Sequence, residues 1–336
     1  MRNRLLPSLL TAVSLFIALA TPATAQEAAA PSRGPRSGQI AEIVAEAQGL
    51  ERLHALIVAQ NGRILIEESL RGPALDQPVN IKSASKSIIS ALVGRAIGEG
   101  LLEGVDQPIA PLLAEHLPDD PDPRLRQVTI GNLLSMQAGL ERTSGRNYGR
   151  WVASRDWVRF ALSRPFADEP GGGMLYSTGS THLLSAILTK VSGRSTRDLL
   201  VEWLGEPLGI EVGAWDRMAL SPLSLLRFGE MMRNRGKTGD TQLLSPQWID
   251  QAWTPRTRSV LSGDRYGYGW FMREMRGHKV YYAWGYGGQM LYIVPDLALT
   301  IVMTSDDSAP GGRSGHVDDL HDLVADRIIP AAEQST

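Results

Sequence analysis

The stretch NIKSASKSIIS (residues 80–90) places a serine and a lysine, Ser83 and Lys86, three positions apart at the start of an apolar segment. Side chains three apart on a helix share a face, so we expect the Ser83 hydroxyl and the Lys86 ammonium to lie about one hydrogen bond apart. A serine hydroxyl becomes a good nucleophile beside a base, and a lysine amine supplies one where its surroundings favour the neutral form. The spacing therefore predicts a nucleophile and its base on one turn of a buried helix.

The same two residues are also typical of a helix N-cap followed by a surface lysine, because serine is a favoured N-cap. The chain contains five lysines, and only Lys86 has a serine three residues before it. The pair alone leaves both interpretations open, so the rest of the chain has to distinguish them.

The composition excludes several classes of function. The chain has 336 residues, of which 43% are hydrophobic and 21% are charged, and its net charge is -2. This balance provides no basic surface, so we expect no nucleic-acid partner. The sequence has no cysteine, which excludes disulfides, thiolate catalysis and cysteine-ligated metals. It also has no Gly-x-Ser-x-Gly motif, which argues against a Ser-His-Asp hydrolase of the α/β-hydrolase type.

Two histidines near the C-terminus are candidates for a metal site. His316 and His321 lie among three aspartates, Asp318, Asp319 and Asp322. Positions five apart do not share a helical face, so we interpret this segment as a solvated helix face and expect no metal site. Nothing else in the sequence indicates a cofactor.

The first 25 residues have the pattern of a signal peptide. Arginines precede an apolar run over residues 5–20, and the Ala-Thr-Ala sequence at residues 23–25 is a small-x-small cleavage site. We expect a signal peptide over residues 1–25 and a flexible leader over residues 26–38. The mature protein is then expected to be exported, periplasmic or secreted, without a stable membrane anchor. The alternative is an uncleaved anchor, for which the apolar run is short.

Apolar spacing predicts the order of helices and strands along the chain. A helix is expected from residue 40, followed by two strands around Asn61-Gly62, the strongest short-range hairpin signal. A helical middle follows, in which residues 128–140 and 151–162 are each expected to form one helix. The C-terminal third predicts antiparallel strands and a terminal helix. Because a lone hairpin cannot bury its faces, we expect it to join the C-terminal strands in one sheet.

The resulting fold class is α+β, with an antiparallel sheet flanked by the N- and C-terminal helices and an all-helical lobe. One domain is expected over residues 39–332. Its sheet lobe takes about residues 39–80 and 260–332, and its helical lobe takes about residues 84–255. We expect a site between the two lobes, next to the start of the Ser83 helix.

Two glycine-flanked stretches are candidates to complete that site. In residues 171–179, Tyr176 lies where a glycine-rich loop meets a helix, and a tyrosine near a lysine can relay protons to and from Ser83. In residues 283–289, glycines at a strand end allow close approach to a ligand, and an N–H there could bind an oxyanion together with that of Ser83. Each stretch also fits a plainer role, a loop-packing tyrosine or a turn between strands.

In this order, the motifs resemble those of the serine β-lactamase and penicillin-recognising superfamily, in its class C branch. That branch includes family VIII esterases, D-aminopeptidases and 6-aminohexanoate-dimer hydrolases. Ser83-x-x-Lys86 resembles the first motif, Tyr176-Ser177-Thr178 resembles the Tyr-x-Asn motif, and residues 284–289 resemble the third motif. The resemblance covers roughly residues 40–330 and implies an α/β sandwich with an all-helical lobe.

The resemblance also implies roles for individual residues. Ser83 would be acylated, Lys86 and Tyr176 would share the acid–base work, and the N–H groups of Ser83 and Tyr286 would bind the oxyanion. The implied substrate contacts come from six residues, Thr178, Trp284, Gly285, Gly287, Gly288 and Gln289. Together they would bind a small-molecule ester, amide or lactam, without a cofactor.

Two positions depart from the family pattern. The third motif usually begins with a cation that pairs with a substrate carboxylate, whereas Ala283 and Trp284 precede Gly285 in this chain. Thr178 stands where asparagine is usual, and a hydroxyl lacks the reach of an amide. We therefore expect a serine hydrolase acting on an ester or an amide. The alternatives are β-lactamase or D,D-peptidase activity, and a penicillin-binding sensor without turnover.

Overall fold

The computed structural model describes residues 37–212, 218–308 and 315–334. The expected signal peptide and residues 26–36 of the expected leader lie outside the described residues. The first helix, α1 (Ser37–Gly49), begins two residues inside the stretch that we expected to be leader.

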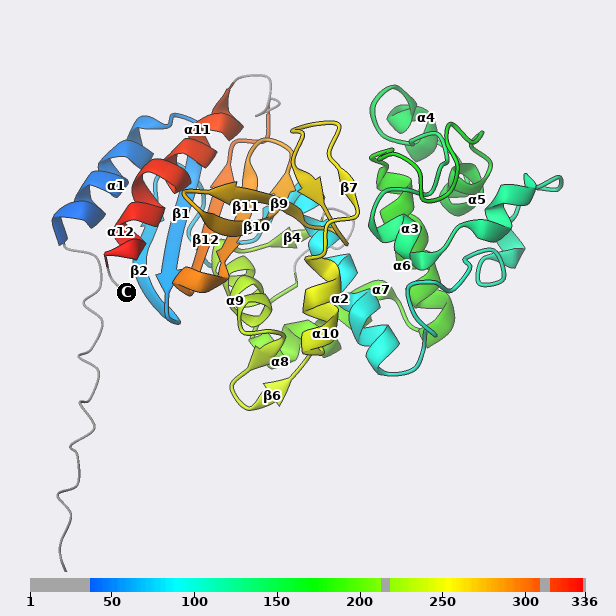
Figure 1. The fold of residues 1–336 in the computed structure, drawn as a ribbon, viewed down its shortest axis with the longest axis horizontal. Helices are drawn as coiled ribbons and strands as arrows, with labels where there is room; N and C mark the ends of the chain where they lie inside the picture. Colours follow the sequence, from blue (N-terminus) through cyan, green and yellow to red (C-terminus); the bar gives the residue numbers. More distant parts are fainter. Residues whose placement is uncertain (1–36, 213–217, 309–314, 335–336) are drawn as a thin grey trace, which may run out of the picture. The chain divides into compact units, whose positions relative to one another are not determined.

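An antiparallel sheet of eight strands lies at the centre of the described residues, in the order β2-β1-β12-β11-β10-β9-β8-β7 (Figure 1). The N-terminal hairpin joins this sheet through the pairing of β1 with β12, as the sequence predicted. Its turn lies at Asn61 and Gly62, whose φ angles of 52° and 76° suit the tight turn that Asn-Gly favours. The strands are β1 (Leu53–Gln60), β2 (Arg63–Ser69), β7 (Thr257–Arg258), β8 (Arg265–Tyr266), β9 (Phe271–Met275), β10 (His278–Gly285), β11 (Gln289–Val294) and β12 (Leu299–Ser305).

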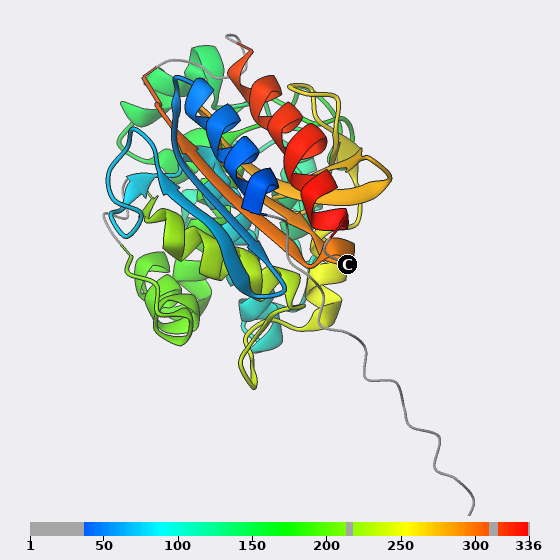
Figure 2. The same ribbon diagram turned by 90° about the vertical axis from the view of Figure 1, so that its left-hand side faces the viewer.

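Helices cover both faces of this sheet. On one face lie α1, α11 (His316–Leu323) and α12 (Ile329–Glu333), as Figure 2 shows. On the other face, α2 (Ser85–Gly98) and α9 (Pro222–Arg233) contact the central strands. Side chains alternate along a strand, so Ile301 and Met303 of β12 enter one apolar core and Val302 enters the other.

The position of α9 differs from the expectation that residues 84–255 form a separate helical lobe. A Cβ atom on Gly229 of α9 would lie 2.6 Å from Leu291, so the helix rests directly on β11. Every residue of β11 is buried. A strand buried on both faces needs apolar cover on both sides, and the two terminal helices cover only one side. Part of the helical middle therefore forms the second layer of a sandwich.

Several other middle helices pack against one another as the helical lobe, and two of the expected helices are shorter than predicted. Residues 128–140 contain only the short α3, which ends before Met136 adopts a φ of 63°. Residues 151–162 are divided between α4 and α5, because the side chain of Asp156 caps a new helix start. The remaining elements are α3 (Ile130–Leu134), α4 (Tyr148–Val152), α5 (Trp157–Leu162), α6 (Thr178–Ser192), α7 (Thr196–Leu200), α8 (Glu206–Leu208), α10 (Pro246–Ala252), and the strand pairs β3 (Val79–Asn80) with β4 (Ala219–Leu220) and β5 (Lys237–Thr238) with β6 (Thr241–Gln242).

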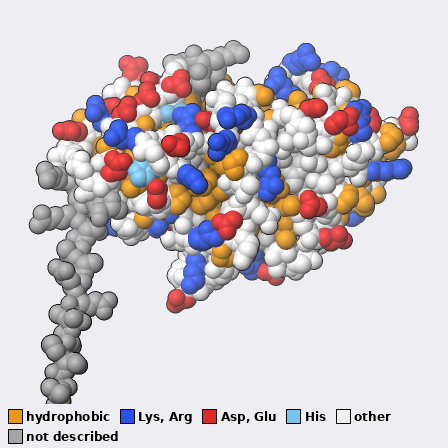
Figure 3. All heavy atoms as spheres, in the orientation of Figure 1, with side chains coloured by type: hydrophobic (Ala, Val, Ile, Leu, Met, Phe, Trp, Pro, Cys, Tyr) orange, Lys and Arg blue, Asp and Glu red, His pale blue; other side chains and the backbone are white. Residues whose placement is uncertain are grey.

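Acidic and basic side chains are interspersed over the face of the molecule in Figure 3. Many of them pair at the surface, such as Lys190 with Glu115 at 2.7 Å. Exposed pairs of this kind each contribute little to stability, typically about 0–1 kcal/mol. Within the described residues, no helix combines the length and the apolar character needed to cross a bilayer.

The expectation that His316 and His321 lie on a solvated helix face is wrong. These residues are only 4% and 5% exposed, whereas the aspartates of α11 are exposed. His321 lies one helical turn after the buried Val317, and its Nδ1 atom is 3.1 Å from the hydroxyl of Tyr292 on β11. The buried stripe of this helix is thus wider than its apolar residues indicate. Within the described residues, no group of three or more potential ligands could hold a metal ion.

The burial of His321 predicts a loss of stability in acid. Burial, with the positive charge of Arg273, lowers the pKa of His321 from 6.5 to about 3. Between these values the unfolded chain takes up a proton that the folded chain does not, so the free energy of unfolding falls as the pH drops. The loss approaches about 1.4 kcal/mol per pH unit. In His321→Leu this contribution is absent. Urea unfolding at about pH 7 and at about pH 4.5 measures how much the free energy of unfolding falls between the two. We expect this fall to be about 2 kcal/mol smaller in His321→Leu than in the parent. Equal losses in the two proteins would contradict this account.

Candidate active site

Ser83 lies on a sharp turn between a short strand and a helix. β3 is followed by a single 3-10 turn, η1 (Lys82–Ala84), which continues into α2. Lys82 has a φ of 51°, in the left-handed region that a non-glycine residue occupies at a cost in free energy. Its N–H donates to Asn80 Oδ1 at 2.9 Å, and its Nζ lies 2.7 Å from Asp307 Oδ2. These two contacts hold the turn that presents Ser83.

Lys86 donates a hydrogen bond from Nζ to Ser83 Oγ at 3.2 Å, the contact that the three-residue spacing implies. The residue is only 5% exposed and has no carboxylate partner among the described residues. Its Nζ lies 5.1 Å from the centre of the Tyr176 ring, within the range of a cation–π contact. A Cβ atom on Gly269 would lie 2.8 Å from the Lys86 carbonyl oxygen, so neighbouring backbone packs closely against this helical turn. The amine is therefore held between a hydroxyl and an aromatic ring.

Tyr176 is presented by a loop that neighbouring side chains hold in place. Gln137 donates from Nε2 to two carbonyl groups of the glycine-rich loop before Tyr176. After Tyr176, the hydroxyl groups of Thr143 and Ser144 accept hydrogen bonds from the first N–H groups of α6. They satisfy helix-terminal donors that the side chain of Ser177, at the N-cap position, leaves unpaired. The structure thus brings Tyr176 to the Ser83–Lys86 pair through fixed contacts.

Aromatic rings extend the site toward the sheet. The rings of Tyr176 and Tyr266 meet edge-on, with centroids 6.4 Å apart at an interplanar angle of 73°. Tyr266 on β8 is buried, and this burial, together with the neighbouring Tyr176, raises its pKa. Trp284 on β10 is half-buried, and its ring lies 5.6 Å from that of Phe271. Because these side chains pack on one apolar cluster, one side of the site is aromatic.

The end of β10 makes a close backbone contact with the Ser83 turn. A Cβ atom on Gly285 would lie only 2.2 Å from the carbonyl oxygen of Ile81, so no larger residue fits there. After Gly285 the chain turns through Gly287 and Gly288, with φ angles of 89° and 107°, and the Gly288 N–H donates to the Gly285 carbonyl at 3.1 Å. The turn that carries the Tyr286 N–H therefore lies beside the turn that carries the Ser83 N–H.

Three other expected site residues differ in their surroundings. Tyr286 is 48% exposed at the tip of its turn. Thr178 lies at the start of α6, where its Oγ1 is 3.1 Å from Ser144 Oγ. Gln289 is only 1% exposed, and both polar atoms of its amide are bonded to the backbone of Ser305. The Gln289 side chain is therefore part of the protein interior behind the turn.

Some residues at the site were not identified from the sequence. Asn80 and Asp307 hold the Ser83 turn, and Ile81 supplies the carbonyl against which Gly285 packs. Asn80 and Ile81 stand just before Ser83, in the stretch of residues 80–90, but neither belongs to the Ser-x-x-Lys pair, and Asp307 is distant in the sequence. Tyr266 differs, because it lies in an aromatic and glycine-rich stretch, residues 266–270, that could have pointed to the site.

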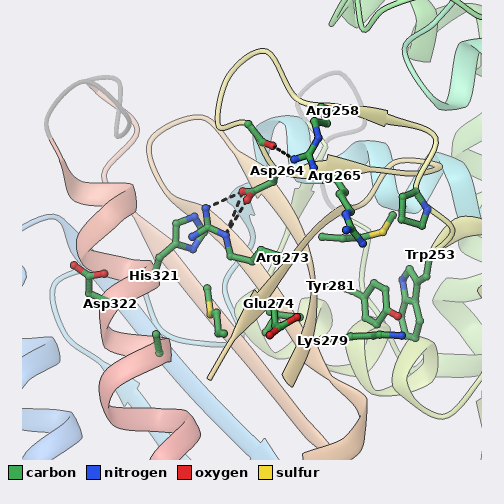
Figure 4. Close-up of a pocket in the computed structure, with 16 residues that line it drawn as sticks. Trp253, Arg258, Asp264, Arg265, Arg273, Glu274, Lys279, Tyr281, His321 and Asp322 are labelled. Carbon is green, nitrogen blue, oxygen red and sulfur yellow. Dashed lines mark hydrogen bonds and ion pairs between the residues drawn. The ribbon is translucent and has the colours of Figure 1, made fainter. Parts of the chain in front are cut away.

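A separate pocket of about 710 Å³ lies at the β7–β9 edge of the sheet (Figure 4). Within it, Arg273 and Asp264 form an ion pair at 2.8 Å. The stacked rings of Trp253 and Tyr281, with centroids 4.2 Å apart, form another part of its wall. Neither Ser83 nor its lysine and tyrosine partners line this pocket, so the candidate chemistry lies elsewhere.

Comparison with known proteins identifies the family. Residues 45–217 match the family model described as Beta-lactamase, and this match covers more than half of the 336 residues. The chain belongs to the beta-lactamase family. This is a family of serine hydrolases, and the matched region contains Ser83, Lys86 and Tyr176. No curated protein matches the chain.

Solved structures share the fold of this beta-lactamase family member at low sequence identity. EstCE1, a hydrolase with promiscuous acyltransferase activity, has 17% identity and a TM-score of 0.70, covering 86% of this chain and 100% of its own. A candidate 6-aminohexanoate-dimer hydrolase from Bacillus anthracis has 19% identity and a TM-score of 0.69, with coverage of 86% and 81%. An octameric penicillin-binding protein homologue from Pyrococcus abyssi has 18% identity and a TM-score of 0.68, with coverage of 86% and 77%. These likenesses establish the fold and leave the substrate open.

The contact between Gly285 and Ile81 predicts a severe effect of Gly285→Ala. The added methyl group would meet a backbone oxygen, so β10 and the Ser83 turn have to move apart. Because small displacements of reacting groups are costly, we expect a loss of at least about 100-fold in the rate of reaction at Ser83. The rate of labelling by a fluorophosphonate measures this.

The matched control is Gly277→Ala, in the hairpin at the other end of β10. A Cβ atom there meets nothing within 4 Å, although the φ of 84° makes the substitution strained. We expect Gly277→Ala to lower stability by about 1 kcal/mol and to leave the labelling rate unchanged. A Gly285→Ala protein that labels like this control would refute the assigned role of the contact.

Proposed function

We propose that this protein hydrolyses an ester or amide bond through an acyl-enzyme formed on Ser83. The observation that carries the proposal is the 3.2 Å hydrogen bond from Lys86 Nζ to Ser83 Oγ, made by a lysine that is 5% exposed. An amine held there without a carboxylate partner among the described residues is suited to take the hydroxyl proton as Ser83 attacks a carbonyl carbon.

The reaction would proceed in two steps. Ser83 Oγ bonds to the carbonyl carbon, its proton passes to Lys86 or Tyr176, and the N–H groups of Ser83 and Tyr286 stabilise the oxyanion. The carbon–oxygen or carbon–nitrogen bond of the substrate then breaks, and the leaving group takes up the proton. In the second step a water molecule gives a proton to the same base while its oxygen bonds to the acyl carbon. Ser83 regains its proton as the carboxylic acid leaves.

The residues at the end of β10 favour an ester or a simple amide over a β-lactam. A substrate carboxylate would need a cation beside Gly285, but the two preceding residues are Ala283, which is 1% exposed, and Trp284. Trp284 packs on the aromatic side of the site, and Tyr286, on the turn that follows Gly285, is exposed. Both rings are suited to contact an apolar acyl or leaving group.

Intact-protein mass after exposure to a fluorophosphonate tests the nucleophile. We expect one adduct on the parent, none on Ser83→Ala, and one on the control Ser85→Ala, which alters a serine two residues further along. In the same assay, Lys86→Ala and Tyr176→Phe should each slow labelling by about 10²–10⁴-fold, the usual contribution of an acid–base group. Lys190→Ala and Tyr281→Phe, which lie outside the site, should label at the parent rate.

The outcomes separate the competing functions. Labelling of folded Ser83→Ala at the parent rate would remove Ser83 as the nucleophile, and a loss below about tenfold for Lys86→Ala or Tyr176→Phe would contradict their roles. Incubation with benzylpenicillin addresses the alternative activities. We expect no lasting adduct, and a stable penicilloyl adduct at Ser83 would favour the penicillin-binding interpretation instead.

We also propose that the protein is exported to the periplasm or beyond. The proposal is supported by the signal-peptide pattern of residues 1–25. N-terminal sequencing of the protein recovered from the periplasmic fraction should give Gln26 as the first residue. Recovery in the cytoplasm with residues 1–25 still attached would contradict it.

A further inference from the structure

A buried hydrogen-bond network connects α11 to the turn between β10 and β11. His316 Nε2 lies 2.9 Å from Ser305 Oγ, and Ser305 Oγ donates to the carbonyl oxygen of Gly288 at 3.1 Å. Gln289 donates to the Ser305 carbonyl at 2.7 Å and accepts the Ser305 N–H at 3.2 Å. The three side chains, of His316, Ser305 and Gln289, belong to residues that are 4%, 5% and 1% exposed. The end of β12, the start of α11 and this turn are therefore bonded together away from water.

The network fixes the protonation of His316. A serine hydroxyl has a single proton, and a carbonyl oxygen can only accept one, so Ser305 uses its proton on Gly288 and His316 Nε2 must donate. Burial, with the positive charge of Arg52, lowers the pKa of His316. His316 is also the first residue of α11, where the helix dipole disfavours a positive charge. The imidazole is thus neutral at pH 7, with its proton on Nε2.

The turn needs support from outside because its own residues restrict it little. Gly287 and Gly288 have φ angles of 89° and 107°, in a region open to glycine, the residue with the greatest backbone freedom. A Cβ atom on Gly288 would lie 3.0 Å from Ser305 Oγ and 3.1 Å from His316 Cδ2, so the pair packs directly against the turn. The same turn carries the Tyr286 N–H. An oxyanion donor acts well only within about 2.7–3.1 Å of the developing charge, so its position has to be held closely.

We propose that His316 and Ser305 are positioning residues that hold the oxyanion-binding turn by bonding to the Gly288 carbonyl. They act through the backbone and do not touch the substrate. Gln289, the residue after Gly288, also ties this turn to β12, because its side-chain amide bonds to the backbone of Ser305. The inference rests on the proposed function, because it gives the Tyr286 N–H its role in the reaction.

The test is the second-order rate of labelling by a fluorophosphonate, whose phosphoryl oxygen requires the oxyanion donors. Ser305→Ala removes only the hydroxyl that joins His316 to the Gly288 carbonyl. His316→Leu removes the Nε2–H donor and puts an apolar side chain of similar bulk in its place. We expect each to slow labelling by at least about tenfold. His316→Gln places an amide donor near the position of Nε2, and we expect it to retain a rate within about threefold of the parent.

The matched control is His321→Leu on the same helix. His321 is equally buried, but it bonds to Tyr292 and not to the turn, so its loss also weakens the interior. Urea unfolding of every variant gives its loss of stability, which is compared with its change in labelling rate. We expect His321→Leu to lose stability and yet label within about twofold of the parent, a separation that a purely structural role of His316 would not produce.

The outcomes distinguish this inference from the proposed function. A parent protein that is not labelled at Ser83 would refute the proposed function itself. A labelled parent with folded Ser305→Ala reacting at the same rate would refute only the positioning role. If His321→Leu and His316→Leu slow labelling equally, the positioning role is also refuted, because a general loss of stability would then explain the slower labelling. If His316→Leu fails to fold, the labelling rate of Ser305→Ala decides the question.

Discussion

The rest of the structure depends on one constraint, the burial of the Lys86 amine beside the hydroxyl of Ser83. Among the described residues, no carboxylate pairs with this amine. A polar group removed from water is costly unless the protein surrounds it with suitable partners. Most of α2 is buried, and Gly94, six residues after Ile88, lies against the ring of Trp248. This burial requires a sheet on one side of α2 and helices on the other. The sandwich therefore keeps the Lys86 amine away from water and beside the Ser83 hydroxyl.

The candidate site residues come from three distant segments, and each segment is held by contacts of its own. The Ser83 turn is held through Lys82, Tyr176 is held by hydroxyl groups that cap α6, and the end of β10 is held against the Ile81 carbonyl by the absence of a side chain at Gly285. A helix start, a loop and a strand end thus each supply part of the candidate site, and contacts around each part fix its position. Such an arrangement allows the loops to change specificity without disturbing the fold.

The family and the fold are established, but they do not by themselves determine a substrate. The solved structures of similar fold include a hydrolase with acyltransferase activity and a penicillin-binding protein homologue, each less than 20% identical to this chain. One scaffold therefore serves different chemistries. In this chain Ala283 and Trp284 precede Gly285, where the resemblance to the family pattern implies a cation. That local difference is the reason for favouring an uncharged acyl substrate.

The sequence by itself determined the local features of this protein. The Asn61-Gly62 turn and the Ser83–Lys86 contact both depend on residues fewer than five positions apart, so spacing and backbone preference were sufficient. It also indicated that the N-terminal hairpin joins the C-terminal strands in one sheet, because an isolated hairpin cannot bury its faces. The sequence did not indicate the lengths of α3, α4 and α5, because helix caps and turns interrupt apolar patterns that look continuous.

Only the tertiary structure decided the contacts between distant segments. The approach of Gly285 to Ile81, the burial of His316 and His321, and the placement of α9 on the second face of the sheet all join residues that no local pattern relates. A histidine has the same appearance in a sequence whether it faces water or a serine hydroxyl. Its burial is set by what packs against its helix, and that depends on the free energy of the whole assembled core rather than on its neighbours in the chain.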